Sequence, residues 1–416
     1  MLDAPSKIAS SPGSNFYLTM IRGLAAGLLG LSVTMSVQAS EKKYGPGASD
    51  TEIKIGNTMP YSGPLSVYGI IGRTEAAYFK KINDEGGING RKINFISYDD
   101  AFSPPKTVEQ TRKLVESDEV LLIFSPTATQ SSGAVMPYLN RQKVPQLFVA
   151  SGASKFSNPK EFPWTMGWIP SYRTEAAIYA RYILSQNPNA RIAILYQRDD
   201  FGRDYLEGLK RGLGEKVSQI VGEAGYETTS PTINSEIVNL KATGADVLVL
   251  ASLGKFTSQT LRTLGDIGWR PQLYLSNTTV AIDTVLKPAG LENSKGAISA
   301  AYRKDPEDPA WADDAGMKEF KSFMEKYVPD GPKNDQAAFG YLEAMAMVQV
   351  LRQCGDNLTR ENVMKEAANL HDLELPLLLP GIKVNTGPTD YSPIKQFKLM
   401  KFDGERWQTF GDVLSE

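Results

Sequence analysis

The sequence contains a single histidine, His371, and a single cysteine, Cys354, among its 416 residues. One cysteine cannot form an intrachain disulfide, and the apolar segment 345–351 before it predicts a thiol packed on a buried helix face. A catalytic triad would have to use His371, which lies at the end of a predicted helix, where solvated or capping histidines are common. Spaced His/Cys sets for zinc, G-x-S-x-G, phosphate loops and G-x-G-x-x-G after a strand are missing as well. We therefore expect no enzymatic activity, no metal and no cofactor.

An excess of charge of either sign is also missing. The 45 Lys and Arg nearly cancel the 47 Asp and Glu. A chain without a large single-sign field is a poor candidate for binding nucleic acid or an anionic membrane surface. The balance favours a small-molecule partner.

Long apolar runs are absent after the first forty residues. Segment 20–22 supplies a basic start, 24–35 is apolar, and 37–39 is a small-residue cleavage pattern ending at Ala39. The alternative, a membrane anchor, is disfavoured because the run is too short for a ~30 Å hydrocarbon core and contains two glycines. We expect an exported protein cleaved near Ala39, with translation starting at Met1 or Met20.

From residue 52 onward, short apolar runs of β type alternate with amphipathic segments, the pattern of parallel sheets covered by helices. Predicted strands are 53–57, 93–98, 120–124, 146–149, 192–196, 247–250 and 296–300, and predicted helices are 73–83, 105–117, 173–184, 317–327 and 339–347. The helix at 105–117 is expected to start through Ser103 as cap and Pro104 as first residue. The sequence thus predicts an α/β protein with two lobes.

Two acidic pairs are open to a chemical interpretation. Asp99-Asp100 follows a predicted strand and could act in acid/base or Mg²⁺ chemistry. Neighbouring residues on an extended chain point in opposite directions, so turn formation is the favoured interpretation. Asp199-Asp200 precedes a helix, and capping explains it.

Two loops rich in small hydroxyl residues are stronger candidates for a binding site. Segments 125–133 and 150–154 each follow a predicted strand and lead toward a helix. Ligands of open α/β sheets bind at such carboxyl ends, and free N–H groups at a helix N-terminus suit a carboxylate. Helix capping alone would account for one such loop, so a binding role and a capping role both remain open.

The chain resembles the leucine/isoleucine/valine-type periplasmic binding proteins of ABC transporters. The resemblance rests on Ile53-Lys54-Ile55-Gly56, Tyr61-Ser62-Gly63-Pro64 with Tyr68-Gly69, Ile82-Asn83-Asp84-Glu85-Gly86-Gly87-Ile88-Asn89-Gly90, Tyr98-Asp99-Asp100, Phe201-Gly202 and Gly265 to Gly268. It implies two doubly wound parallel-sheet lobes joined by a three-crossing hinge, of residues 51–171 plus 303–391 and 172–302 plus 392–416. It also implies a periplasmic monomer that closes around a ligand and delivers it to a membrane permease.

The resemblance also suggests ligand-binding residues. The family's carboxylate clamp corresponds here to Ala128 or Thr129 and to the loop from Gly152 to Ser154. An aromatic wall corresponds to Tyr68 and Phe201. The complete set of candidates is Tyr68, Thr127, Ala128, Thr129, Gly152, Ala153, Ser154, Trp168, Tyr172, Phe201, Leu253 and Asn277.

The sequence departs from the family at the ligand ammonium. Tyr172 and Asn277 stand where amino-acid binders have acidic residues, and a buried ammonium without a carboxylate partner costs several kcal/mol. A shift of the alignment would instead place Glu175 or Asp283 there. We therefore predict a carboxylate ligand with an aromatic or aliphatic body and no ammonium. The alternatives are an amino acid, amide or urea ligand, a sensory module, or an α/β hydrolase, which the missing nucleophile disfavours.

Overall fold

A five-stranded parallel sheet forms the first half of the molecule. The computed structural model describes residues 42–415. The strand order is β3-β2-β4-β5-β6, with β2 (Glu52–Met59), β3 (Lys92–Asp99), β4 (Leu122–Phe124), β5 (Gln146–Val149) and β6 (Thr165–Gly167). Leu122 and Phe124 pack into one apolar cluster and Ile123 into another, because successive side chains of a strand point to opposite faces. Both faces of the sheet are therefore buried.

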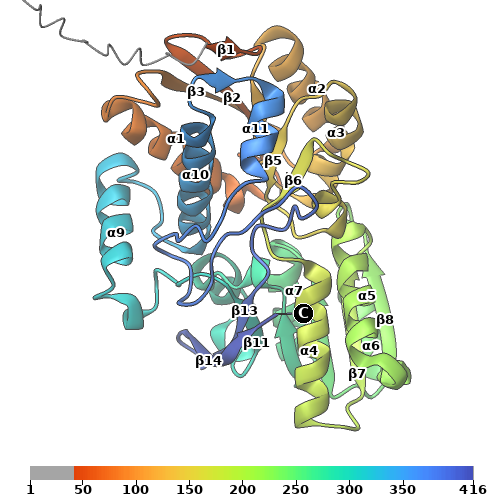
Figure 1. The fold of residues 1–416 in the computed structure, drawn as a ribbon. Helices are drawn as coiled ribbons and strands as arrows, with labels where there is room; N and C mark the ends of the chain where they lie inside the picture. The colour runs from red at the N-terminus through yellow and green to blue at the C-terminus, as the bar shows by residue number, and fades with distance from the viewer. Residues whose placement is uncertain (1–41, 416) are drawn as a thin grey trace, which may run out of the picture. The chain divides into compact units, whose positions relative to one another are not determined.

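Helices cover both faces of this sheet (Figure 1). The helices of this half are α1 (Gly69–Asp84), α2 (Pro104–Arg112), α3 (Thr129–Arg141), α9 (Ala315–Tyr327), α10 (Asp335–Cys354) and α11 (Arg360–Ala367). Helix α10 packs along α1, and α2 packs on α3. A small parallel pair, β1 (Lys43–Tyr44) with β12 (Asn357–Leu358), joins the beginning of the described chain to the segment after α10.

A seven-stranded sheet forms the second half, in the order β14-β13-β11-β10-β9-β7-β8. Its parallel strands are β7 (Ile192–Gln197), β8 (Ile220–Tyr226), β9 (Val247–Ala251), β10 (Gln272–Leu275) and β11 (Ile298–Ala301), and β13 (Phe397–Phe402) and β14 (Trp407–Leu414) add an antiparallel edge. The helices are α4 (Tyr172–Gln186), α5 (Asp200–Leu213), α6 (Asn234–Ala242), α7 (Lys255–Asp266) and α8 (Lys287–Ala289). The expectation of parallel sheets is thus corrected at this edge, where a hairpin closes the sheet.

The chain passes between the two sheets three times. It leaves the first after β6, leaves the second after β11, and returns from the helices of the first to β13. Both sheets share one topology: β2 lies between β3 and β4, and β7 lies between β8 and β9. The strand order therefore reverses beside β2 and beside β7, and ligands of such sheets bind at the carboxyl ends of the strands there.

Most predicted elements are confirmed, with shifted ends. Strand β5 matches its predicted bounds, whereas α1 begins four residues before the predicted 73, and α2 ends at Arg112 and continues as a π-helical turn, Lys113–Ser117. Ser103 does occupy the cap position of α2, but its side chain makes no capping hydrogen bond. The Thr107 hydroxyl instead bonds to the Ser103 carbonyl oxygen and to Asp100.

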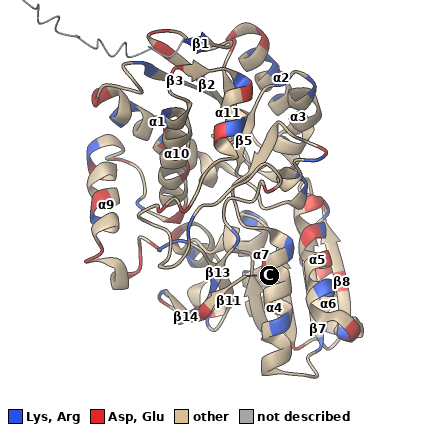
Figure 2. Ribbon diagram, viewed as in Figure 1, with Lys and Arg blue, Asp and Glu red and all other residues tan. Residues whose placement is uncertain are grey.

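The predicted export segment, residues 20–39, lies outside the described residues. None of the helices in residues 42–415 combines the length and hydrophobicity that crossing a bilayer requires. Basic and acidic side chains alternate over the helices of both halves, so neither half presents a face of a single charge in this view (Figure 2). This distribution agrees with the near-zero net charge of the sequence.

Candidate ligand-binding site

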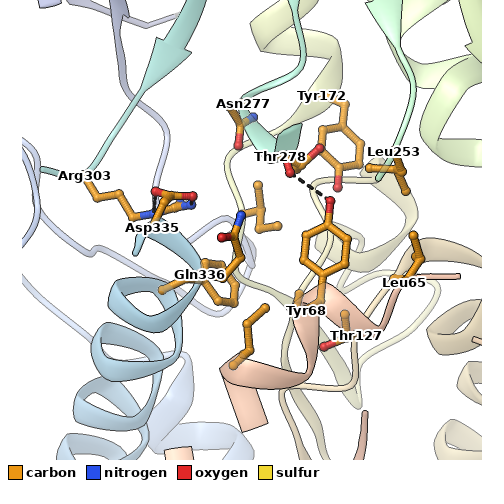
Figure 3. A pocket seen from close by; sticks show the side chains of 15 residues that line it. Leu65, Tyr68, Thr127, Tyr172, Leu253, Asn277, Thr278, Arg303, Asp335 and Gln336 are labelled. Atoms are coloured by element: carbon orange, nitrogen blue, oxygen red, sulfur yellow. Dashed lines mark hydrogen bonds and ion pairs between the residues drawn. The ribbon is translucent and has the colours of Figure 1, made fainter. Parts of the chain in front are cut away.

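A cavity lies where the carboxyl ends of the two sheets meet. The segments that follow β2, β4, β5, β9 and β10 all contribute to its wall, as the shared topology predicts. Figure 3 shows side chains from both halves pointing toward one another across it. Its lining consists of Leu65, Tyr68, Ile71, Thr127, Ala128, Ala150, Ile169, Tyr172, Leu253, Asn277, Thr278, Arg303, Asp335, Gln336 and Phe339.

Most of this lining is apolar. Leu65, Ile71, Leu253 and Phe339 are buried, and Ile169 is half-buried. Transfer of an apolar group from water onto such a surface contributes about 25 cal/mol per Å². The wall therefore favours a ligand with a hydrocarbon body.

The N-terminus of α3 opens onto the cavity at Ala128. Ala128 is the N-cap, has φ 75° and carries no side-chain acceptor, so no side chain caps this end. The first N–H groups of a helix have no intrahelical carbonyl to bind, and the helix dipole adds partial positive charge there. This end of α3 can therefore hold an anionic oxygen.

The only charged side chains in the lining form a pair. Arg303 donates from Nε to Asp335 Oδ1 at 2.7 Å and from Nη2 to Asp335 Oδ2. Both side chains are at most 10% exposed. Burial is the largest single influence and would lower the pKa of Arg303, but the charge of Asp335, the nearby Tyr302 and the hydrogen bonds to Asp335 together raise that pKa above its usual value. The pair leaves the cavity wall electrically neutral.

Asn277 projects into the cavity from the turn after β10, and a buried acid holds it from behind. Glu175 of α4 accepts hydrogen bonds from the Asn277 backbone N–H at 2.8 Å and from Asn277 Nδ2. The Tyr179 hydroxyl, 2.5 Å away, donates to the same carboxylate. Burial raises the pKa of Glu175 to about 7 despite these donors. Glu175 is fully buried and does not line the cavity.

A hydrogen bond closes the cavity between the two halves. The Tyr68 hydroxyl, in the turn before α1, donates to the Thr278 carbonyl oxygen at 3.0 Å (Figure 3). Tyr68 is 8% exposed and Tyr172 is 3% exposed. The structure thus holds the two halves in contact over the cavity, an arrangement that would shield a bound ligand from water.

Comparison with known proteins supports what this geometry suggests. The family model described as "Periplasmic binding protein" matches residues 52–406. The chain belongs to the periplasmic binding protein family. The "Leu/Ile/Val-binding protein homolog 1" of Brucella abortus (strain 2308) is 23% identical over 332 residues, which cover 77% of this chain and 84% of the relative. The chain is therefore a type I periplasmic binding protein of the branched-chain amino acid family.

Solved structures of two other binding proteins share the fold. A branched chain amino acid ABC transporter protein from Thermus thermophilus with bound valine aligns with a TM-score of 0.78 at 16% identity, over 89% of this chain and 98% of that one. A solute binding protein of an ABC transporter from Rhodopseudomonas palustris BisB5, in complex with 3,4-dihydroxy benzoic acid, gives 0.73 at 19% identity, over 88% and 97%. At this identity the likeness establishes the fold, and the two bound molecules differ in kind.

Half of the residues predicted to bind ligand line the cavity of this binding protein. These are Tyr68, Thr127, Ala128, Tyr172, Leu253 and Asn277. The other six, Thr129, Gly152, Ala153, Ser154, Trp168 and Phe201, lie behind or beside the lining. Trp168 and Phe201 are both 0% exposed. Trp168 packs on Phe148 at 5.0 Å between ring centroids, and Phe201 packs edge-on against Tyr172 at 4.9 Å. They support the wall from outside.

The predicted carboxylate clamp of the second loop is engaged within the protein. Thr129 Oγ1 pairs with Ser151 Oγ at 2.7 Å, and the Ala153 N–H donates to Ser151 Oγ. At Gly152 an added Cβ would lie 2.4 Å from the Pro170 carbonyl oxygen, so only glycine fits. The loop therefore packs against Pro170, in the segment of chain that connects the two sheets.

Ser154 binds a carboxylate of the protein itself. Its N–H and Oγ donate to Asp204 of α5 at 2.6 and 3.1 Å, and Arg173 Nε donates to the same group. Lys155 pairs with Asp200 of α5 at 2.6 Å. The sequence correctly indicated that this loop suits a carboxylate, but the carboxylate in the structure comes from the other half of the molecule.

This arrangement predicts the behaviour of Ser154→Ala. We expect ligand affinity to change by less than about threefold, because the hydroxyl does not line the cavity, and stability to fall by about 1 to 2 kcal/mol, because a hydrogen bond to a charged group is lost. Isothermal titration and urea unfolding measure the two effects. Ser157→Ala, in the same turn, is the control. A tenfold loss of affinity without a loss of stability would return Ser154 to the ligand site.

Three charged or polar lining residues that the sequence analysis did not predict are Arg303, Asp335 and Gln336. Arg303 lies two residues after the end of β11, and Asp335 and Gln336 open α10. Their positions at the end of a strand and the start of a helix were a usable signal. The ion pair between Arg303 and Asp335 could not be predicted from the sequence, because 32 residues separate the two side chains and no local pattern connects them.

The structure also tests what the sequence predicted for the acidic pairs, the single histidine and the single cysteine. Asp99 and Asp100 both accept the backbone N–H two residues ahead, which confirms the turn interpretation. Asp199 caps α5 by accepting from the Gly202 N–H, as predicted. His371 is exposed and contacts Asn369, and Cys354 is buried. Asp283 is exposed, pairs with Lys287 and does not line the cavity.

Proposed function

We propose that this protein is the exported receptor of an ABC importer and binds a small carboxylate with an aromatic or aliphatic body and no ammonium group. Family membership supports a substrate-binding, non-enzymatic role in the periplasm. The predicted export segment supports the same location. The ligand would be delivered to a membrane permease after the two lobes, 51–171 plus 303–391 and 172–302 plus 392–416, close on it as a monomer.

The neutral cavity wall is the observation that carries the ligand class. Asp335 is the only acidic side chain in the lining, and Arg303 neutralises it through two hydrogen bonds. Glu175 and Asp283 are both outside the lining. A ligand ammonium would therefore lack a free carboxylate and would lose several kcal/mol on burial.

The uncapped N-terminus of α3 supports a carboxylate at the other end. Backbone N–H groups at a helix start bind anionic oxygens by charge-assisted hydrogen bonds, about twice as strong as neutral ones. Leu65, Ile71 and Phe339 form an apolar wall of the same cavity, which suits a hydrocarbon body.

Calorimetric titration of the mature protein tests the proposal. We expect benzoate or hexanoate to bind with micromolar or tighter affinity, and the neutral isostere benzamide to bind at least about tenfold more weakly, because it cannot offer a charged oxygen to α3. Leucine and valine are the competing ligands, since Arg303 could turn to their carboxylate and free Asp335 for their ammonium. Micromolar binding of leucine or valine, with no response to the organic acids, would overturn the proposed ligand class.

A further inference from the structure

The amide of Asn277 is fixed by the acid behind it. Glu175 is 0% exposed and does not line the cavity. It accepts three hydrogen bonds, from the Tyr179 hydroxyl, the Asn277 backbone N–H and Asn277 Nδ2. A carboxylate can only accept, so the donor end of the Asn277 amide must face Glu175. The acceptor end, Oδ1, then has to face the other way.

Asn277 Oδ1 faces the cavity. Asn277 is 3% exposed and lines the cavity, and Figure 3 shows its amide oxygen directed into it. No donor among residues 42–415 reaches Oδ1. Oδ1 is therefore a free acceptor at the cavity surface, and a ligand donor can form a hydrogen bond with it.

A second acceptor stands at the same end. Gln336 opens α10, is 5% exposed and lines the cavity, and its Oε1 has no hydrogen-bond partner among the described residues. Arg303, the nearby cation, directs two of its donors to Asp335. The end of the cavity formed by Asn277 and Gln336 therefore offers two acceptors, and the charges of Arg303 and Asp335 beside it neutralise each other.

We propose that Glu175 is a specificity-positioning residue: by holding Asn277 Nδ2 it turns Oδ1 toward the ligand, so that the preferred carboxylate carries a neutral hydrogen-bond donor, a hydroxyl or an uncharged amino group, at its distal end. This inference rests on the proposed function and narrows it from organic acids in general to donor-bearing ones. A site with a fixed buried acceptor rejects analogues that bring a second acceptor.

The test compares ligands that differ only in the distal group. 4-Aminobenzoate and 3-aminobenzoate bring an uncharged aromatic amine, a donor, whereas 4-formylbenzoate and 3-formylbenzoate bring an acceptor of similar size. Isothermal titration at pH 8 keeps Glu175 mainly ionised, because the pKa of this carboxyl is about 7. We expect the wild type to bind the better aminobenzoate at least about tenfold more tightly than its formyl counterpart.

Glu175→Gln is the decisive variant. Its new amide keeps an oxygen for the Asn277 backbone N–H and Tyr179 but directs an N–H toward Asn277 Nδ2, which forces the Asn277 amide to turn its N–H groups to the cavity. The preference for amino over formyl should then fall by about tenfold or reverse. A purely structural loss would weaken both ligands equally and leave their ratio unchanged.

Two further variants keep the result unambiguous. Glu343→Gln removes another fully buried carboxyl that does not line the cavity, and it should retain the wild-type ratio. Asn277→Ala removes the acceptor itself and should bring the ratio near one, which tests the inference even where Glu175→Gln yields too little folded protein. A wild type that binds both ligand types equally would overturn this inference and leave the proposed function standing. A wild type that binds no carboxylate would overturn the proposed function.

Discussion

Arg303→Ala is expected to lower the free energy of unfolding by about 3 to 5 kcal/mol, the usual cost of removing one partner of a buried ion pair. Asp335 would keep its charge in a wall where its side chain is only 10% exposed. Two hydrogen bonds would be lost with the guanidinium. The Phe339 ring, 5.3 Å below the Arg303 cation, would lose its cation contact as well. Urea unfolding of wild type and variant measures the difference.

Arg406→Ala is the matched control. Arg406 pairs with Asp308 at 3.4 Å, but its side chain is 43% exposed. A pair that open to solvent contributes about 0 to 1 kcal/mol. Removing both charges of the buried pair in Arg303→Met with Asp335→Leu should recover most of the stability lost in Arg303→Ala. A loss below about 1 kcal/mol in Arg303→Ala would show that water enters the cavity and screens Asp335.

Arg303→Ala should also change which ligands the protein prefers. Without Arg303 the cavity wall carries the unpaired negative charge of Asp335, which repels a carboxylate and attracts an ammonium. Affinity for benzoate-type acids should fall at least about tenfold, whereas that for leucine or valine should fall less or rise. Parallel titrations of both ligand kinds measure this change. Equal losses for both kinds would contradict a neutralising role for Arg303.

The architecture was predictable because it depends on local patterns. Apolar β-type runs became strands β2, β5, β7 and β9, and the helical stripe at 317–327 became α9. The segments after β2, β4, β5 and β9 line the cavity, so Thr127, Ala128 and Leu253 could be located from topology and resemblance. Strand β13 was missed, and its partner β11 lies about one hundred residues earlier in the chain; β14, which pairs with β13 in a hairpin, was missed with it.

The chemistry of the site was less predictable because it depends on partners distant in sequence. Ser154 has the residue type and position of a ligand clamp, yet Asp204, fifty residues later, takes its donors. Glu175 was considered as an acid facing the ligand, yet Asn277, a hundred residues later, takes its carboxylate. Residue types indicate what a group can bind, and only the packed structure determines what it does bind.

A second large effect is expected on stability against pH, from a buried pair of carboxyl groups. Glu75 of α1 and Glu343 of α10 are both 0% exposed, one helical turn beyond the cavity-lining Ile71 and Phe339. The Ser125 hydroxyl donates to Glu343 at 2.8 Å. Burial raises the pKa of Glu75 to about 8, and burial together with the negative charge of Glu75 raises the pKa of Glu343 well above its usual value.

The sign of the effect follows from the proton balance. Between the ordinary glutamate pKa near 4.5 and about 8, the folded protein holds a proton on Glu75 that the unfolded chain has released. Stability therefore decreases as pH rises through this range, by about 1.4 kcal/mol per pH unit for each full proton. Below pH 4.5 both states are protonated and the contribution is fully present.

Glu75→Gln should remove this slope. The amide of the variant keeps the shape of a protonated carboxyl but cannot ionise, so urea unfolding at pH 5, 6, 7 and 8 should give a difference from wild type that grows with pH in favour of the variant. Subtracting the stability of wild type from that of the variant at each pH cancels the contributions of Glu175 and Glu307, whose pKa values are also raised by burial. Glu85→Gln, just beyond the end of α1 and exposed, is the control and should leave the slope unchanged. If Glu75→Gln kept the wild-type dependence of stability on pH, Glu75 would already be ionised and hydrated in the folded protein. The charge would then lie directly behind the ligand site, because α1 and α10 also carry Ile71, Asp335 and Phe339 into the cavity.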